Sequence, residues 1–167
     1  MECVRTGIDV MVVLLILSLA VAASYLAFSA GRSGIPVSIS ATHYAHPAHK
    51  WLFPAAMGVT ALTLYPAWIS VSHEPTEGLA FGACASLLFV AASPCFREEL
   101  EGKVHYTSAA VCCICAVLWQ ICEGLWDVTL WCGVIGLMLT LQDRRNWCWW
   151  MECAVLVSVY LNLFRLI

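Results

Sequence analysis

The sequence predicts an all-α fold, an integral membrane bundle of six transmembrane helices in one domain that covers residues 1–167. Hydrophobic residues make up 62% of the chain and charged residues only 11%, whereas ordinary soluble domains carry about 25% charged residues. Six long apolar stretches follow one another, and the short connections between them hold most of the charges. Inside lipid each stretch must satisfy its own backbone hydrogen bonds, and an α-helix does so.

Each expected helix approaches the length of about 20 apolar residues that crosses a hydrocarbon core about 30 Å thick. The third and fifth are the shortest, so we expect them to begin inside the neighbouring turns. The spans are expected at residues 8–28, 51–72, 78–93, 106–122, 128–142 and 148–164. Tryptophan gathers near both ends of the spans, as in the aromatic belts of membrane proteins. One belt would contain Trp51, Trp147, Trp149 and Trp150, and the other Trp68, Trp119, Trp126 and Trp131.

Lysine and arginine in the connections predict the orientation, because cytoplasmic loops of membrane proteins carry an excess of both. The connections after the first, third and fifth spans hold Arg32, Lys50, Arg97, Lys103, Arg144 and Arg145, whereas the other side holds Arg5 and Arg165. We therefore expect the odd-numbered connections on the cytoplasmic face and both termini outside.

Ten cysteines raise the question of a metal site or a disulfide. No pair of Cys-x-x-Cys motifs is present, so the zinc-ribbon signature is absent. Inside a span, a thiol packs as a small apolar side chain. This applies to Cys84, Cys112, Cys113, Cys115, Cys132 and Cys153. The candidates for disulfides lie only near the span ends, with Cys3 and Cys122 on one side and Cys95 and Cys148 on the other.

Residues suited to binding or catalysis gather in the odd-numbered connections, which share one membrane face in any six-span topology. The last of them leads into Glu152, about 8 Å inside the sixth span. An ionisable side chain at that depth is costly, so Glu152 should face the bundle and hold a partner. We expect one polar pocket with candidate ligand-binding residues Ser40, Thr42, His43, Tyr44, Glu98, Glu101, His105 and Glu152, with Ser38 beside them.

Two further expectations concern the turns. His105 is expected at the start of the fourth span, with a turn at Gly102 that folds Glu98 back to form a hydrogen-bonded pair with it. On the opposite face the short turns offer acidic residues and one histidine that read as solvated helix caps. These are His73, Glu74, Glu77, Glu123 and Asp127.

Two short motifs resemble a known membrane family. Ile39-Ser40-x-Thr42, followed by Pro47 and Phe53, resembles the Pro-x-Ile-Ser-x-Thr…Pro-Glu…Phe stretch of the DRAM-type membrane proteins, a six-span family that includes Golgi proteins that help remodel the lipid of GPI anchors. Phe96-x-Glu98, His105 and Ala109 resemble its Phe-x-Glu…His-x-x-x-Ala block. Uncharacterised bacterial relatives with a Ser-Ile-Ser-x-Thr-x-Tyr loop and a His-Tyr-x-x-Ala segment are the closer match.

The resemblance implies a role in lipid or membrane homeostasis and supplies no catalytic mechanism. Two residues depart from the family pattern: Pro36 stands one place further from Ser40, and His49 occupies roughly the position of the family's glutamate. The family would also place the long first connection on the non-cytosolic face, against the charge count.

The residues leave two main function classes open. The first is a protein that binds, senses or helps to handle a lipid, with serine, threonine and histidine recognising its headgroup. The alternative is a small intramembrane hydrolase or acyltransferase that acts on a lipid. Its nucleophile would be Ser38 or Ser40, its general base His43 or His105, and its orienting carboxylate Glu98 or Glu152.

No cofactor is predicted, and zinc is the alternative, held by His43, His46, His49 and His105 to activate water. The sequence contains no Gly-x-Ser-x-Gly or His-Glu-x-x-His motif. A small-solute transporter or channel is a weaker alternative, because no inverted repeat is visible. The net charge of −3 argues against nucleic-acid binding. The expected partners are membrane lipids, with a homo-oligomer or a partner membrane protein left open.

Overall fold

The computed structural model of the chain describes residues 2–45, 47–95 and 98–167 and confirms the all-α class, with 87% of residues in helices. The helices are α1 (Glu2–Ser33), α2 (Thr42–Ala45), α3 (Leu52–Val71), α4 (Glu77–Ala92), α5 (Glu98–Cys122), α6 (Trp126–Gln142) and α7 (Trp147–Leu166). Single 3₁₀ turns follow α2, α4 and α6, at Pro47–His49, Ser93–Cys95 and Arg144–Asn146.

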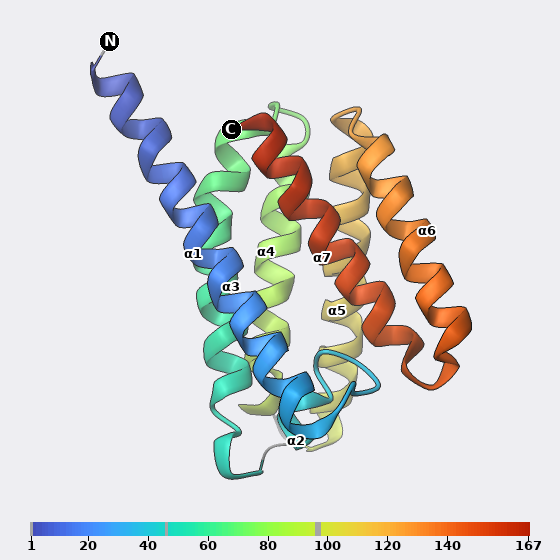
Figure 1. Cartoon of the computed structure of the whole chain (residues 1–167). Helices are drawn as coiled ribbons and strands as arrows, with labels where there is room; N and C mark the ends of the chain where they lie inside the picture. The colour runs from blue at the N-terminus through green and yellow to red at the C-terminus, as the bar shows by residue number, and fades with distance from the viewer. Residues whose placement is uncertain (1, 46, 96–97) are drawn as a thin grey trace.

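The six long helices run up and down beside one another (Figure 1). Both termini and the α3–α4 and α5–α6 turns lie at one end, which we call the termini end. The α1–α3 connection with α2, the turn after α4 and the α6–α7 turn lie at the opposite end, which we call the α2 end. The odd-numbered connections therefore share one end of the bundle.

Within the described residues, four helical segments are long and apolar enough to cross a membrane. They are Asp9–Ser33, Leu52–Val71, Gly102–Cys122 and Arg144–Leu166. The other two apolar helices are shorter, since α4 has 16 residues and α6 has 17. A spanning helix usually needs about 17–25 residues, so length alone places these two at or just below the limit.

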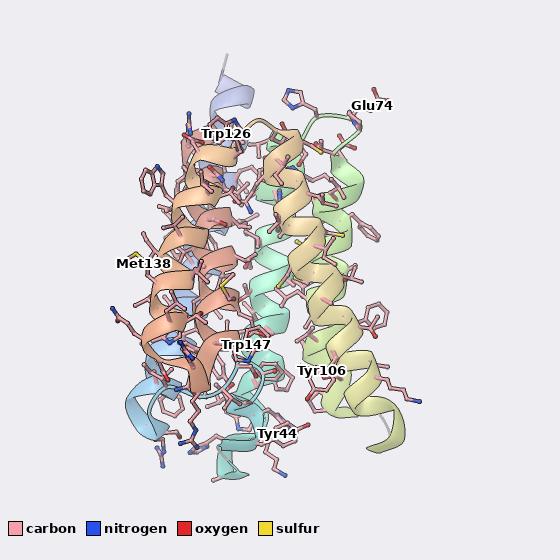
Figure 2. The ribbon with its side chains drawn as sticks, turned by 90° about the vertical axis from the view of Figure 1, so that its right-hand side faces the viewer. Tyr44, Glu74, Tyr106, Trp126, Met138 and Trp147 are labelled. Carbon is pink, nitrogen blue, oxygen red and sulfur yellow. The ribbon has the colours of Figure 1, made fainter. Side chains whose placement is uncertain are left out.

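The outer surface of the bundle is apolar, as expected of a protein surrounded by lipid. Met138 on the outer face of α6 is 58% exposed, and Figure 2 shows aromatic side chains near both ends, with Tyr44, Tyr106 and Trp147 at the α2 end and Trp126 at the termini end. The expected belts are correct for Trp51, Trp147, Trp126 and Trp131, which are exposed. They are wrong for Trp68, Trp119 and Trp149, which are buried, because these large rings fill the core between helices.

The helix that contains the expected fourth span begins well before His105, since α5 starts at Glu98 and its apolar segment long enough to cross a membrane starts at Gly102. Gly102 continues the helix and forms no turn. A glycine inside a helix costs only about 1 kcal/mol relative to alanine. Three glutamates among the first four residues also suit the positive end of the helix dipole. The connection between α4 and α5 is correspondingly shorter than the sequence suggested.

Sequential helices pack as antiparallel neighbours, with α3 against α1 and α4, and α4 against α5. The outermost helix, α6, packs mainly on α7, and Gly136 lies at their closest approach. A Cβ at Gly136 would stand 2.7 Å from the Cβ of Ala154 and 3.3 Å from the carbonyl oxygen of Trp150. Close contact between small residues is the usual way in which membrane helices associate, because lipid supplies no hydrophobic drive.

We predict that Gly136→Ala destabilises the protein by about 1–3 kcal/mol, the usual cost of overpacking, because neither the Ala154 methyl nor the α7 backbone can move aside. Gly133→Ala is the matched control, since a Cβ there meets nothing within 4 Å. Thermal unfolding in detergent would measure both, and Ala154→Gly should restore the Gly136→Ala variant. Equal melting temperatures for the two alanine variants would show that α6 and α7 are not packed this closely.

Candidate functional site

A short segment after α1, residues 34–41, crosses the N-terminus of α7, and we call it the strap. It leaves α1 at Gly34, whose φ of 75° lies in the left-handed region that favours glycine. The backbone N–H of Trp149 donates to the carbonyl oxygen of Val37 at 3.2 Å. The backbone N–H of Ile39 donates to Oε2 of Glu152 at 2.6 Å. The strap therefore satisfies a first-turn donor of α7, which no helical carbonyl can reach, and pairs the Glu152 carboxyl.

The hydroxyl groups of the strap mostly hold its own conformation. The Oγ of Ser38 accepts from the backbone N–H of Ala41 at 3.1 Å and lies 3.0 Å from the Oγ of Ser40. The fully buried Thr42 donates to the carbonyl oxygen of Ile39 at 2.5 Å and hydrogen-bonds the hydroxyl of Tyr25. Ser38 and Thr42 therefore act in the turn, and Ser40 is the strap hydroxyl that reaches the interior.

Glu152 lies one and a half turns inside α7, about 7.5 Å from its first residue. Besides the Ile39 N–H, the Cys148 thiol lies within hydrogen-bond reach of its carboxyl group. A carboxyl group at this depth was expected to have a partner. That partner is a backbone amide of the strap.

His105 projects from the second turn of α5, and its Nδ1 lies 2.9 Å from the Oγ of Ser93 in the turn after α4. Ser93 donates its only hydroxyl proton to the carbonyl oxygen of Val90 at 2.8 Å. The His105 Nδ1–H is therefore the donor to Ser93. Glu98 lies in the same helix about 10.5 Å further along the axis, so no turn folds it back toward His105; the side chains of Glu98 and Glu101 lie outside the described residues.

A cavity opens beneath the strap, and Ser40, His105 and Glu152 line it at the α2 end. It follows α3 from Phe53 to Trp68, about 22 Å at 1.5 Å per residue. Its volume is about 110 Å³, measured as the space open to the centre of a water-sized sphere. Small side chains on α4 and α5 create this space, namely Ala83, Cys84, Ala109, Cys112, Cys113 and Ala116.

Two buried polar side chains on α3 line the cavity and lack hydrogen-bond partners in the described structure. They are the hydroxyl Oγ1 of Thr60 and the indole Nε1 of Trp68. Both residues are at most 3% exposed. A buried donor without a partner costs about 1–3 kcal/mol.

The histidines of the first connection lie away from this cavity. His43 has its Nδ1 3.1 Å from the carbonyl oxygen of Lys50 and its ring against Phe53. Tyr44 is 63% exposed, and His49 is half-buried in its own 3₁₀ turn. His46 lies outside the described residues. Among the residues that the structure describes, no three histidine, cysteine or acidic side chains form a group suited to a metal ion.

Among the described residues, no hydrogen bond joins Ser38 or Ser40 to a histidine. The thiols of Cys122 and Cys148 are free, which argues against both candidate disulfides; the side chains of their candidate partners, Cys3 and Cys95, lie outside the described residues. The cysteines of α5 do not all face different sides, since Cys112 and Cys113 both line the cavity.

Comparison of the chain with protein-family models gives no match, and neither the curated proteins nor the solved structures give one.

Several polar residues inside the spans have roles that we did not assign from the sequence. Ser18 joins three helices, since it lies 2.7 Å from the hydroxyl of Tyr160 and donates to the carbonyl oxygen of Thr60 at 3.0 Å. Asn162 donates to Oε1 of Gln120 at 2.8 Å. The sequence did contain a signal for these roles, because polar residues within apolar spans usually face the bundle interior.

At the termini end, Glu123 is not a solvated cap, because its side chain is only 3% exposed. Its carboxyl accepts from the backbone N–H of His73 at 3.0 Å, contacts Nδ1 of His73 at 2.5 Å and accepts from the hydroxyl of Thr76. Burial by itself raises the pKa of Glu123, but the hydrogen bonds from Thr76 and His73 outweigh it and lower the pKa below the ordinary value of 4.5. The group ties the α3–α4 turn to the α5–α6 turn.

We predict that Glu123→Gln destabilises the protein by about 1–3 kcal/mol at neutral pH. Because the folded-state pKa of Glu123 is lowered, its stabilisation is present above the ordinary value and is lost as the pH falls through the folded value. The difference in melting temperature between wild type and variant should therefore shrink below about pH 4. Glu74→Gln, on the exposed surface of the same turn, is the control. A gap that stays constant down to acidic pH would contradict the arrangement.

Proposed function

We propose that this protein is a multi-pass membrane protein that binds a lipid in the cavity beneath the strap. The acyl portion would lie between α3, α4, α5 and α7, and the polar end would lie at Ser40, His105 and Glu152. The observation that carries the proposal is the continuity of an apolar cavity with a polar mouth in one bundle. Small-molecule sites are typically apolar clefts with a few well-placed polar groups.

The proposal includes six membrane crossings, with α4 and α6 spanning as well. The 3₁₀ turn Ser93–Cys95 extends α4 by about a turn, which brings it into the usual range of spanning lengths, and the 17 residues of α6 already reach the lower limit of that range. Alternation of the helices along the bundle supports the same topology (Figure 1). The charge distribution favours the α2 end on the cytoplasmic side, as in a bacterial cytoplasmic membrane.

The position of the mouth suits a lipid headgroup. Glu152 lies about one and a half turns inside α7, and exposed Tyr44, Tyr106 and Trp147 gather at the same end (Figure 2). Aromatic side chains of this kind mark the headgroup level of a bilayer. A ligand with its polar end there could keep its chain at the depth that it has in the surrounding leaflet. Membership of the DRAM-type family, which the strap and His105 motifs suggest, would agree with such a role.

The lipid-binding proposal is tested by filling the cavity. Ala109 lines it, whereas its neighbour Ala110 is exposed on the outside of α5. Ala109→Leu should lower the amount of lipid that copurifies with the protein by about tenfold, because the added atoms occupy the space of the chain. Native mass spectrometry of the detergent-purified protein would measure the bound fraction.

Ala110→Leu adds the same atoms to the lipid-facing surface and should leave the bound fraction unchanged. Melting temperatures of the two variants would show that both fold. If Ala109→Leu binds as much lipid as Ala110→Leu, the cavity is not the binding site.

The six crossings predict that Glu74 and Arg144, both exposed, lie on opposite sides of the membrane. Single cysteines at these positions, on a background with serine at Cys3, Cys95 and Cys122, should react with an impermeant maleimide from opposite sides. The background protein alone should stay unlabelled, because its remaining thiols lie within the helices. Labelling of both positions from the same side would exclude this topology.

A further inference from the structure

The charges around the cavity restrict the headgroup that its mouth accepts. Its described lining includes one carboxyl group, from Glu152, and no lysine or arginine. The other polar groups at the mouth are the Ser40 hydroxyl and the His105 ring. Among the described lining residues an anionic headgroup would meet the Glu152 carboxyl and no lysine or arginine, at a depth where unpaired charge is costly.

Glu152 acts as a hydrogen-bond acceptor at the α2 end of the cavity. The Ile39 N–H lies 2.6 Å from its Oε2. A carboxylate offers about four lone-pair sites, and the Ile39 amide and the Cys148 thiol use two of them. The remaining capacity suits donors of a ligand.

The dimensions of the cavity restrict the apolar part. Spread over about 22 Å along α3, a volume of 110 Å³ corresponds to a mean cross-section of about 5 Å² for the centre of a water-sized sphere. Carbon atoms pack at separations of about 3.5–4.0 Å. A space of this mean width fits one file of methylene groups better than two chains side by side.

We infer that the ligand is a single-chain amphiphile whose polar end carries hydrogen-bond donors and no negative charge, with Glu152 as the residue that selects it. The inference rests on the proposed lipid-binding function and adds the class of lipid. Hydroxyl and ammonium headgroups belong to this class, because both donate to a carboxylate. A fatty-acid carboxylate and a two-chain phospholipid do not.

Three probes of equal chain length separate the chemistries: hexadecylamine, 1-O-hexadecylglycerol and hexadecanoate. They are offered in equal amounts to the full-length protein in a neutral detergent, and native mass spectrometry measures the bound fractions. Wild type should bind the amine and the alkylglycerol at least about tenfold more tightly than hexadecanoate, since a hydrogen bond to a charged group is worth about a factor of ten or more.

Glu152→Gln removes the charge and keeps an oxygen that can accept the Ile39 N–H, so the strap should remain in place. In this variant the ratio of the affinity for the amine to that for hexadecanoate should fall about tenfold. The affinity for the alkylglycerol should change least. Glu77→Gln, an exposed carboxyl at the termini end, is the matched control and should keep the wild-type ranking. Ala109→Leu should lower the binding of all three probes.

The possible failures are distinct. If wild type binds none of the probes, or Ala109→Leu binds them as well as wild type, the proposed function itself is wrong. If Ala109→Leu blocks binding but wild type takes hexadecanoate as tightly as the amine, lipid binding stands and the inferred headgroup class is wrong. An unchanged ranking in a folded Glu152→Gln variant would remove Glu152 from the selection. The wild-type ranking decides the headgroup class even where that variant fails to fold.

Discussion

The hydrogen bond between the Ile39 amide and the Glu152 carboxyl is the interaction on which the candidate site depends. It solves two problems at once, because a carboxyl inside an apolar bundle needs a donor and a backbone amide that leaves α1 needs an acceptor. The bond holds the strap across α7, which places Ser40 at the mouth of the cavity and covers the first turn of that helix. Without it, Glu152 would keep only the weak donor of the Cys148 thiol beside an apolar cavity, and removing a partner from a buried charge is strongly destabilising.

The cavity exists because α4 and α5 line much of it with small side chains. Ala83, Cys84, Ala109 and Cys112 present short side chains toward α3, whereas close-packed interiors normally leave few voids larger than a water molecule. Where the bundle requires close approach it also uses small residues, as at Gly136 against Ala154, but there the backbones touch. Small residues therefore leave a cavity where the helices stand apart, and they allow close contact where the helix backbones touch.

The sequence predicted the helices and their grouping at two ends because apolar length and short charged connections are local patterns. It misplaced the start of α5, since Glu98, Glu99 and Glu101 read equally well as a loop or as the first turn of a helix. Ser40, His105 and Glu152 were correctly brought to one cavity, but their partners were not found. Those partners are the Ile39 amide and the Ser93 hydroxyl: a backbone group has no sequence signature, and a serine at the end of a span has a weak one.

The two ends of the bundle contain similar residues but use them differently. At the termini end, Glu123 receives the Thr76 hydroxyl and both a backbone and a ring donor of His73, so its acceptor sites are consumed in joining two turns. At the α2 end, Glu152 receives one backbone amide and a thiol beside a cavity that also contacts Thr60 and Trp68, whose buried polar atoms lack partners. A carboxyl with its donors supplied by the fold stabilises a turn, whereas one with acceptor sites left toward an open channel can hold a ligand. This difference in hydrogen-bond satisfaction is the physical reason to place the functional site at the α2 end.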